Sequence, residues 1–173
     1  MNIRLAEREL KTKFGDYTEI LYYDGQSESI TIVMGNVERQ ENILCRIHSS
    51  CISAHVFNSI ECECREEMEI SQAMIEKEGK GVIIWLDQEG KGNGHLALME
   101  SIKYKNEGFS QSKAYEKAGF AADARSFRPA AEILVELKVK SVILITNNPE
   151  KAEDLRRASI VVSDIKQITT AEA

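Results

Sequence analysis

The pattern of hydrophobic and polar residues predicts strands in the first third of the chain. Apolar and polar residues alternate along several short segments that end at turn residues, which is typical of strands. The predicted strands cover residues 17–23, 29–34 and 42–48, with a turn at 24–27. The charged opening stretch, residues 1–13, is expected to carry at most one helical turn.

After this strand-rich opening, helical spacing of apolar residues alternates with short apolar runs. The spacing predicts helices at residues 65–78, 96–106, 110–118, 129–137 and 150–158. The apolar runs predict buried strands at 82–86 and 141–145, followed by a short strand at 160–162. We therefore expect an α+β fold, organised as a single compact domain over residues 1–173, with a mixed sheet and flanking helices.

Composition and charge exclude some classes of function. The 173 residues include 28 acidic and 22 basic side chains, a formal net charge of −6. This balance argues against a nucleic-acid surface, so basic residues near a site would bind a small anion. No apolar run is long enough for a membrane span, and the first residues lack the apolar segment of a signal peptide. We expect a cytoplasmic protein with no nucleic-acid or membrane partner.

Three of the four cysteines, Cys51, Cys62 and Cys64, follow a C-x10-C-x-C spacing. In a reducing compartment, closely spaced thiolates are more often zinc ligands than disulfide halves. If the strip between Cys62 and Cys64 is extended, their side chains point the same way. Three ligands leave a position for water, as in catalytic zinc sites. The spacing also fits buried or adventitious thiols. The fourth cysteine, Cys45, lies in a predicted strand and is interpreted as a core residue.

Four motifs follow one another along the chain. They are R-I-H-S-x-C at residues 46–51, a glycine-rich turn at 88–94, G-F-A-A-D-A-R at 119–125, and T-N-N-P-E-K at 146–151. In this order and at these distances they resemble the GTP cyclohydrolase II family, zinc enzymes that open the guanine imidazole ring for riboflavin synthesis. The resemblance covers nearly the whole chain. It implies a cyclohydrolase II-like fold, a small-molecule nucleotide substrate and a homodimer.

The resemblance also assigns roles to the residues of these motifs. It implies that the three spaced cysteines hold one zinc ion per chain, which activates a water molecule to attack C8 of the purine. Asp123 corresponds to the proton acceptor, and Arg125 to a nucleophile toward the α-phosphorus. Chemistry alone favours Arg125 as a phosphate clamp, because a guanidinium is protonated at any ordinary pH. The two residues also fit a surface ion pair.

Further residues fall at positions where the family contacts its substrate. They are Arg46, Glu67, Glu89, Lys91, Thr146 and Lys151. The resemblance allows Mg²⁺ to accompany the substrate phosphates. The glycines of the turn permit close approach to an anion, although such a loop after a strand is common and lone loop lysines are usually solvated.

The chain departs from the family pattern mainly at these substrate contacts. Ser50 stands where the family has a glutamate, and Glu67 stands where it has a neutral amide. Asp87 and Lys91 each take the place of an arginine, and Ile102 takes the place of a functional tyrosine. His95 is an added group. The altered contacts predict weaker binding of a triphosphate. Three functions stay open: a GTP cyclohydrolase, a relative that hydrolyses a ring in another nucleotide or base-derived heterocycle, and a non-catalytic zinc- or nucleotide-binding paralogue.

Overall fold

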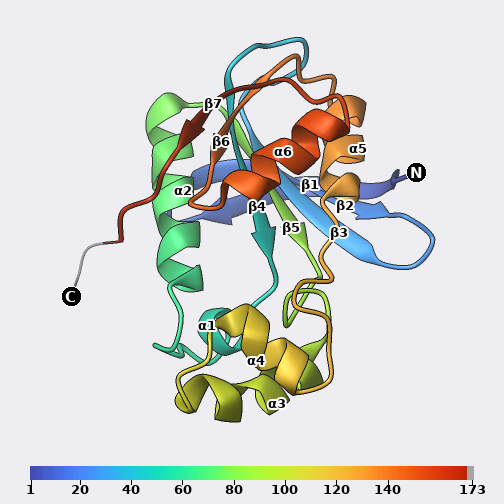
Figure 1. Ribbon diagram of the computed structural model, residues 1–173. Helices are drawn as coiled ribbons and strands as arrows, with labels where there is room; N and C mark the ends of the chain where they lie inside the picture. The colour runs from blue at the N-terminus through green and yellow to red at the C-terminus, as the bar shows by residue number, and fades with distance from the viewer. Residues whose placement is uncertain (171–173) are drawn as a thin grey trace.

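One seven-stranded sheet forms the centre of the protein, in a computed structural model that describes residues 1–170 (Figure 1). The strand order is β1-β2-β3-β5-β4-β6-β7. The strands are β1 (Ile3–Thr12), β2 (Gly15–Tyr23), β3 (Glu28–Met34), β4 (Ile43–Ser49), β5 (Gly81–Leu86), β6 (Val142–Ile145) and β7 (Val162–Lys166). The pairs from β1 to β5 are antiparallel, and those from β5 to β7 are parallel. The sheet is therefore mixed.

Helices cover both faces of this sheet and extend beyond its end. They are α1 (Ile52–His55), α2 (Cys64–Glu78), α3 (His95–Asn106), α4 (Gln111–Lys117), α5 (Arg128–Glu136) and α6 (Pro149–Arg157). Apolar residues of α5 and α6 pack on one face of the sheet, and those of α2 pack on the other. The predicted α+β fold with flanking helices is confirmed.

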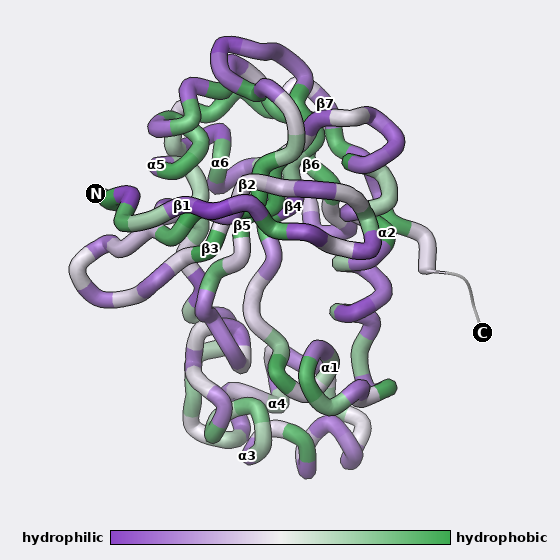
Figure 2. Tube along the Cα trace, turned by 180° about the vertical axis from the view of Figure 1, so that it is seen from behind, coloured by the Kyte–Doolittle hydropathy of each residue, from purple (hydrophilic) through white to green (hydrophobic). Residues whose placement is uncertain are grey.

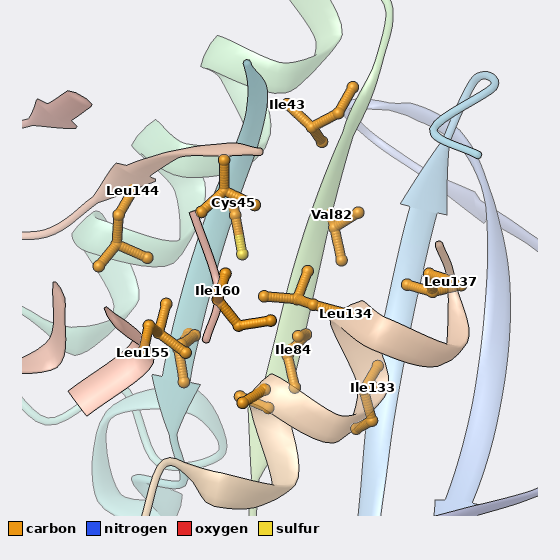
Figure 3. Close-up of a cluster of buried hydrophobic side chains, with 14 of the residues drawn as sticks. Ile43, Cys45, Val82, Ile84, Ile133, Leu134, Leu137, Leu144, Leu155 and Ile160 are labelled. Atoms are coloured by element: carbon orange, nitrogen blue, oxygen red, sulfur yellow. The ribbon is translucent and has the colours of Figure 1, made fainter. Parts of the chain in front are cut away.

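The central strand β4 is buried on both faces, so alternation along it separates two environments. Ile43 and Cys45 belong to the core cluster under α5 and α6 (Figure 3), and Ile47 belongs to the same cluster. Leu44 belongs to the cluster under α2. By the two-residue period of a strand, Arg46 lies on the α2 face, where the chain approaches the carboxyl end of the sheet. Cys45 is fully buried, which confirms its interpretation as a core residue.

The ends of the sheet differ from the sequence prediction. The opening stretch forms the ten-residue strand β1 instead of a helical turn, and it pairs with β2 through a hairpin closed at Gly15 (φ 90°). Most of its side chains are exposed at the sheet edge, so β1 carries little hydrophobic signal. The last strand covers Val162–Lys166 instead of 160–162, because Ile160 is a core residue before the strand. The short helix α1 was not predicted.

Three helices, α1, α3 and α4, gather beyond the carboxyl ends of β4 and β5, as two opposite views show (Figures 1 and 2). The chain enters this group directly after β4, through α1, and again after β5, through the glycine-rich turn. The group therefore faces the strand ends that carry the motif residues. In the described part of the chain, no helix is long and apolar enough to span a membrane.

Candidate functional site

A cleft of about 670 Å³ is lined by residues at the carboxyl ends of the central strands and by residues of α1, α3 and α4. Every predicted site residue except Asp123 lines it. The prediction missed other lining side chains, among them Gln88, Lys105, Gln111 and Tyr115. The four motifs, far apart in sequence, thus meet in one cleft.

The three spaced cysteines form a cluster at the wall of this cleft. Their sulfur atoms all lie within 4.8 Å of one another, and the Sγ atoms of Cys51 and Cys62 are 3.6 Å apart. Cys64 is the first residue of α2 and Glu63 before it has φ −95° and ψ 14°, so the strip from Cys62 to Cys64 is not extended and the condition for parallel side chains is not met. Arg65 fixes the geometry, because its guanidinium donates to the carbonyl oxygens of Ala54 (3.0 Å) and His55 (2.5 Å) at α1.

The donor set of this cluster fits a thiophilic metal ion. Burial, together with the neighbouring thiols, raises the pKa of Cys51 and of Cys64. Three thiolates this close repel one another, so they ionise together only beside a cation. A divalent metal supplies that charge and binds the deprotonated sulfurs. The cluster could therefore hold a metal ion.

The side chain of Arg46 is almost fully paired inside the protein. It is 4% exposed, and its Nη1 donates to the carbonyl oxygen of Ile145 at 3.2 Å. Its Nη2 forms an ion pair with the carboxylate of Glu67 on α2 and lies 3.4 Å from Nδ1 of His48. Only Nε lacks a partner among the described residues. Arg46, which was predicted to bind the phosphates, is therefore already paired with the carboxylate of Glu67.

A histidine pair continues this network. An arginine can only donate, so Nδ1 of His48 accepts and its Nε2 carries the proton. That Nε2 then donates to Nε2 of His55 at 2.9 Å. Burial, with the charge of Arg46 and with His55, lowers the pKa of His48 to about 2, so His48 stays neutral. No histidine of the described chain lines the cleft.

Lys151 and Thr146 place a buried ammonium and a buried hydroxyl in the same wall. Nζ of Lys151 donates to the carbonyl oxygen of Ile47 at 3.2 Å. Burial, reinforced by the charges of Arg46 and Arg125, lowers the pKa of Lys151 to about 7. The hydroxyl of Thr146 is held in a local turn, where it accepts from the N–H of residue 148 at 3.0 Å.

The glycine-rich turn packs against the segment that carries Asp123 and Arg125. A Cβ on Gly92 (φ 81°) would lie 2.7 Å from the backbone of Ala124, and the N–H of Ala124 donates to the carbonyl oxygen of Lys91 at 2.8 Å. Gly92 therefore serves the close approach of two chain segments. The unpredicted Gln88 adds a second tie, because its amide exchanges hydrogen bonds of 2.6 and 3.0 Å with the backbone of Ser126.

Asp123 and Arg125 form a bidentate ion pair. Nε and Nη2 of Arg125 donate to the two carboxylate oxygens at 3.0 and 2.6 Å. Burial acts to raise the pKa of Asp123, but the hydrogen bonds and charge of Arg125 outweigh it and lower that pKa. Arg125 lines the cleft, whereas Asp123 is not part of the lining and reaches it only through its bonds with Arg125. The ion pair expected from the local sequence is present, and it lies at the cleft.

Several departures from the family pattern have a structural position. Asp87 is exposed and outside the cleft lining, and the hydroxyl of Ser50 donates to it at 3.2 Å. Ile102 lines the cleft. The buried carboxylate of Glu89 accepts from the N–H of Ile52 at 3.2 Å and lies 3.7 Å from Nδ1 of His95. The altered charge at residue 87 therefore lies outside the lining, bonded to the lining residue Ser50, whereas Glu67 belongs to the lining.

The fold and the cleft define a class of protein: an α+β domain in which a thiol cluster suited to a metal ion adjoins cations suited to an anionic ligand. A family model described as GTP cyclohydrolase II matches residues 3–167. The chain belongs to the GTP cyclohydrolase II family, which confirms the resemblance drawn from its motifs.

Curated relatives of the chain support the same family assignment. The chain is 40% identical over 155 residues to riboflavin biosynthesis protein RibBA of Bacillus cereus, an alignment that covers 88% of this chain and 39% of that protein. It is also 40% identical over 156 residues to GTP cyclohydrolase-2 of Archaeoglobus fulgidus, covering 89% and 41%. The chain thus spans about two fifths of the length of these curated relatives.

One solved structure shows a similar fold. It is the crystal structure of RibBX, a two-domain 3,4-dihydroxy-2-butanone 4-phosphate synthase from A. baumannii. The TM-score is 0.50 with 13% sequence identity, and the match covers 98% of this chain and 40% of that one. At this identity the likeness supports the fold alone.

The lowered pKa of Lys151 predicts pH-dependent anion binding in the cleft. Sulfate keeps its charge between pH 6 and pH 8, whereas a lysine with a pKa of about 7 changes from mostly protonated to mostly neutral. We expect the affinity for sulfate to fall about tenfold over this range, following the protonated fraction of Lys151. An NMR chemical-shift titration at both pH values measures it.

The matched controls for this experiment are two lysine variants. Lys151→Gln should remove most of the pH dependence, whereas Lys105→Gln, at an exposed lysine of the same cleft, should keep it. Equal sulfate affinity of the unmodified protein at pH 6 and pH 8 would contradict anion binding that follows the protonation of Lys151.

Proposed function

We propose that this chain is a zinc-dependent hydrolase of the GTP cyclohydrolase II type, which opens the imidazole ring of GTP with release of formate and pyrophosphate. The observation that carries the proposal is the shared cleft. It brings the cluster of Cys51, Cys62 and Cys64 together with the side chains that the family resemblance assigns to the nucleotide. Membership of the family supports the substrate and the reaction.

The three cysteines would hold the zinc ion, because soft thiolates in a set of three suit a zinc site with an open position. Bound there, zinc would supply an activated water near neutral pH and polarise the ring. The cluster lies in the lining of the cleft, so a purine that enters the cleft can approach it.

Asp123 and Arg125 would act as a unit. The carboxylate of Asp123 would accept a proton during ring opening, and the bonds from Arg125 that lower its pKa hold it in place at the expense of its basicity. Arg125 uses Nε and Nη2 to hold that carboxylate, which leaves Nη1 for a phosphate oxygen. In the proposed mechanism Arg125 therefore positions Asp123 and binds the phosphate group next to the ribose.

The remaining contacts divide by chemistry. Lys91 and Lys151 would bind phosphate oxygens, and Thr146 would add a hydroxyl, with Mg²⁺ accompanying the phosphate chain. Glu89 is a buried acceptor with one oxygen already bonded to a backbone N–H. Its remaining lone pairs suit the adjacent N–H donors of a guanine base.

The oligomer and the location of the protein belong to the same proposal. The homodimer rests on the family resemblance, and the cytoplasmic location rests on the sequence pattern alone. Exposed apolar side chains around α1 and α3 are the kind of surface that a second copy would cover, among them Val56, Phe57, Leu96 and Met99. Light scattering on the purified chain measures the mass.

The second candidate function is a relative that hydrolyses a ring in another nucleotide or base-derived heterocycle. The observation in its favour is the rewritten cleft, in which Glu67 pairs with Arg46 and Ile102 stands in the lining. A non-catalytic paralogue is the third candidate, and it predicts no turnover of any compound.

A product scan separates these candidates. We expect the zinc-loaded protein to release formate from GTP, with pyrophosphate measured separately, because the family chemistry cuts two kinds of bond. Formate from other purine nucleotides but none from GTP would favour the second candidate. If the zinc-loaded protein turns over no compound of the panel, only the non-catalytic paralogue remains.

The metal site predicts about one zinc per chain. Cys62→Ser and Cys64→Ser should lose zinc and activity together, because the deprotonated sulfur is the ligand. Metal analysis by mass spectrometry and turnover measure both effects. Cys45→Ser is the matched control, since Cys45 is buried in the core away from the trio and should keep its zinc. A metal-free Cys62→Ser protein with full activity would contradict the assignment.

Asp123 is predicted to act in the chemical step. Asp123→Asn should keep the fold and the metal while lowering kcat about 10²-fold or more, the usual scale for a general acid–base residue. Steady-state kinetics and thermal melting measure the two properties. A variant with the rate of the unmodified enzyme would mean that Asp123 serves only as the partner of Arg125.

A further inference from the structure

The charge balance of the cleft does not suit a long phosphate chain. The cations that line it are Arg46, Lys91, Lys105, Arg125 and Lys151. The carboxylates that line it are Glu61, Glu67 and Glu89, and the thiol cluster adds further negative charge once its sulfurs are deprotonated. A nucleoside triphosphate brings about four negative charges at neutral pH, so this cleft offers it little excess positive charge.

Most of these cations already have partners. The two Nη atoms of Arg46 are bonded to Ile145 and Glu67. Nζ of Lys91 donates to the hydroxyl of Ser112 at 3.2 Å. Nε and Nη2 of Arg125 donate hydrogen bonds to the carboxylate of Asp123. Only the partner of Arg46 is a carboxylate that itself lines the cleft, so it competes with an incoming anion for the same guanidinium.

We propose that Glu67 is a specificity-determining residue: by holding the guanidinium of Arg46, it withholds one bidentate phosphate clamp and shifts the cleft toward nucleotides with a short phosphate chain. A phosphate can form the fork of two hydrogen bonds with Arg46 only by displacing this carboxylate. The site thereby discriminates less among a nucleoside tri-, di- and monophosphate than the open guanidinium would.

The surrounding structure keeps this pair in place. Glu67 belongs to the first turn of α2, one turn after Cys64, and the ties of Arg65 to α1 hold that turn. Arg46 is 4% exposed and anchored to Ile145 on β6, so it cannot swing away from α2 without losing both bonds. The pair is therefore a fixed feature of the cleft and not a flexible surface contact.

The inference rests on the proposed function only in taking a nucleotide as the ligand of this cleft. The test compares guanosine, GMP and a GTP analogue with a methylene bridge between the α- and β-phosphorus, by calorimetry on the zinc-loaded protein. Glu67→Gln keeps an oxygen that can accept from Arg46 but removes the charge. We expect this variant to bind the GTP analogue at least about tenfold more tightly, the scale of one charge-assisted hydrogen bond, and guanosine unchanged within about twofold.

Two further variants isolate the mechanism. Glu61→Gln removes an equal charge from the cleft lining, but Glu61 bonds to Ser59 and not to a cation, so its effect on the GTP analogue should stay below about threefold. In an Arg46→Gln background, Glu67→Gln should gain almost nothing, because the two residues act through one pair. Glu67→Ser repeats the test should Glu67→Gln fail to fold.

The outcomes separate this inference from the proposed function. Unchanged affinity of Glu67→Gln for the GTP analogue overturns the inference while leaving the proposed function standing. The same holds if the unmodified protein prefers the analogue over guanosine by several orders of magnitude. If none of the three ligands binds any variant, the nucleotide site itself is wrong, and both proposals fall.

Discussion

The burial of one permanent charge, the guanidinium of Arg46, organises the carboxyl end of the sheet. A guanidinium stays protonated at any ordinary pH, so a buried one must be paired. Arg46 meets this need with a carbonyl oxygen of β6, the carboxylate of Glu67 and a ring nitrogen of His48. These bonds join β4, β6 and α2 at the point where the cleft opens.

The position of α2 in turn determines where the three cysteine thiols lie. Cys64 begins this helix, Glu67 is one turn further along it, and Arg65 between them ties it to α1 just after Cys51. The ion pair and the sulfur cluster therefore share one helical turn. A change in how α2 meets β4 would alter the metal ligands and the anion-binding wall together.

The second half of the cleft depends on close backbone packing. Gly92 lets the turn after β5 touch Ala124, and Gln88 holds the backbone of Ser126. These ties place Arg125 at the cleft, with Asp123 bonded to it. The glycines that the sequence associates with anion approach thus also serve contact between two segments of the same chain.

The sequence by itself determined the family, the α+β class, the core position of Cys45, and the trio Cys51, Cys62 and Cys64, because these depend on residue types, order and local periodicity. It missed β1, whose exposed side chains carry no burial signal. Only the tertiary structure decided which charges meet. Arg46 and Glu67 lie 21 residues apart, and their pairing depends on how α2 packs against β4. Such pairing depends on distance and burial across the fold, which local sequence patterns do not encode.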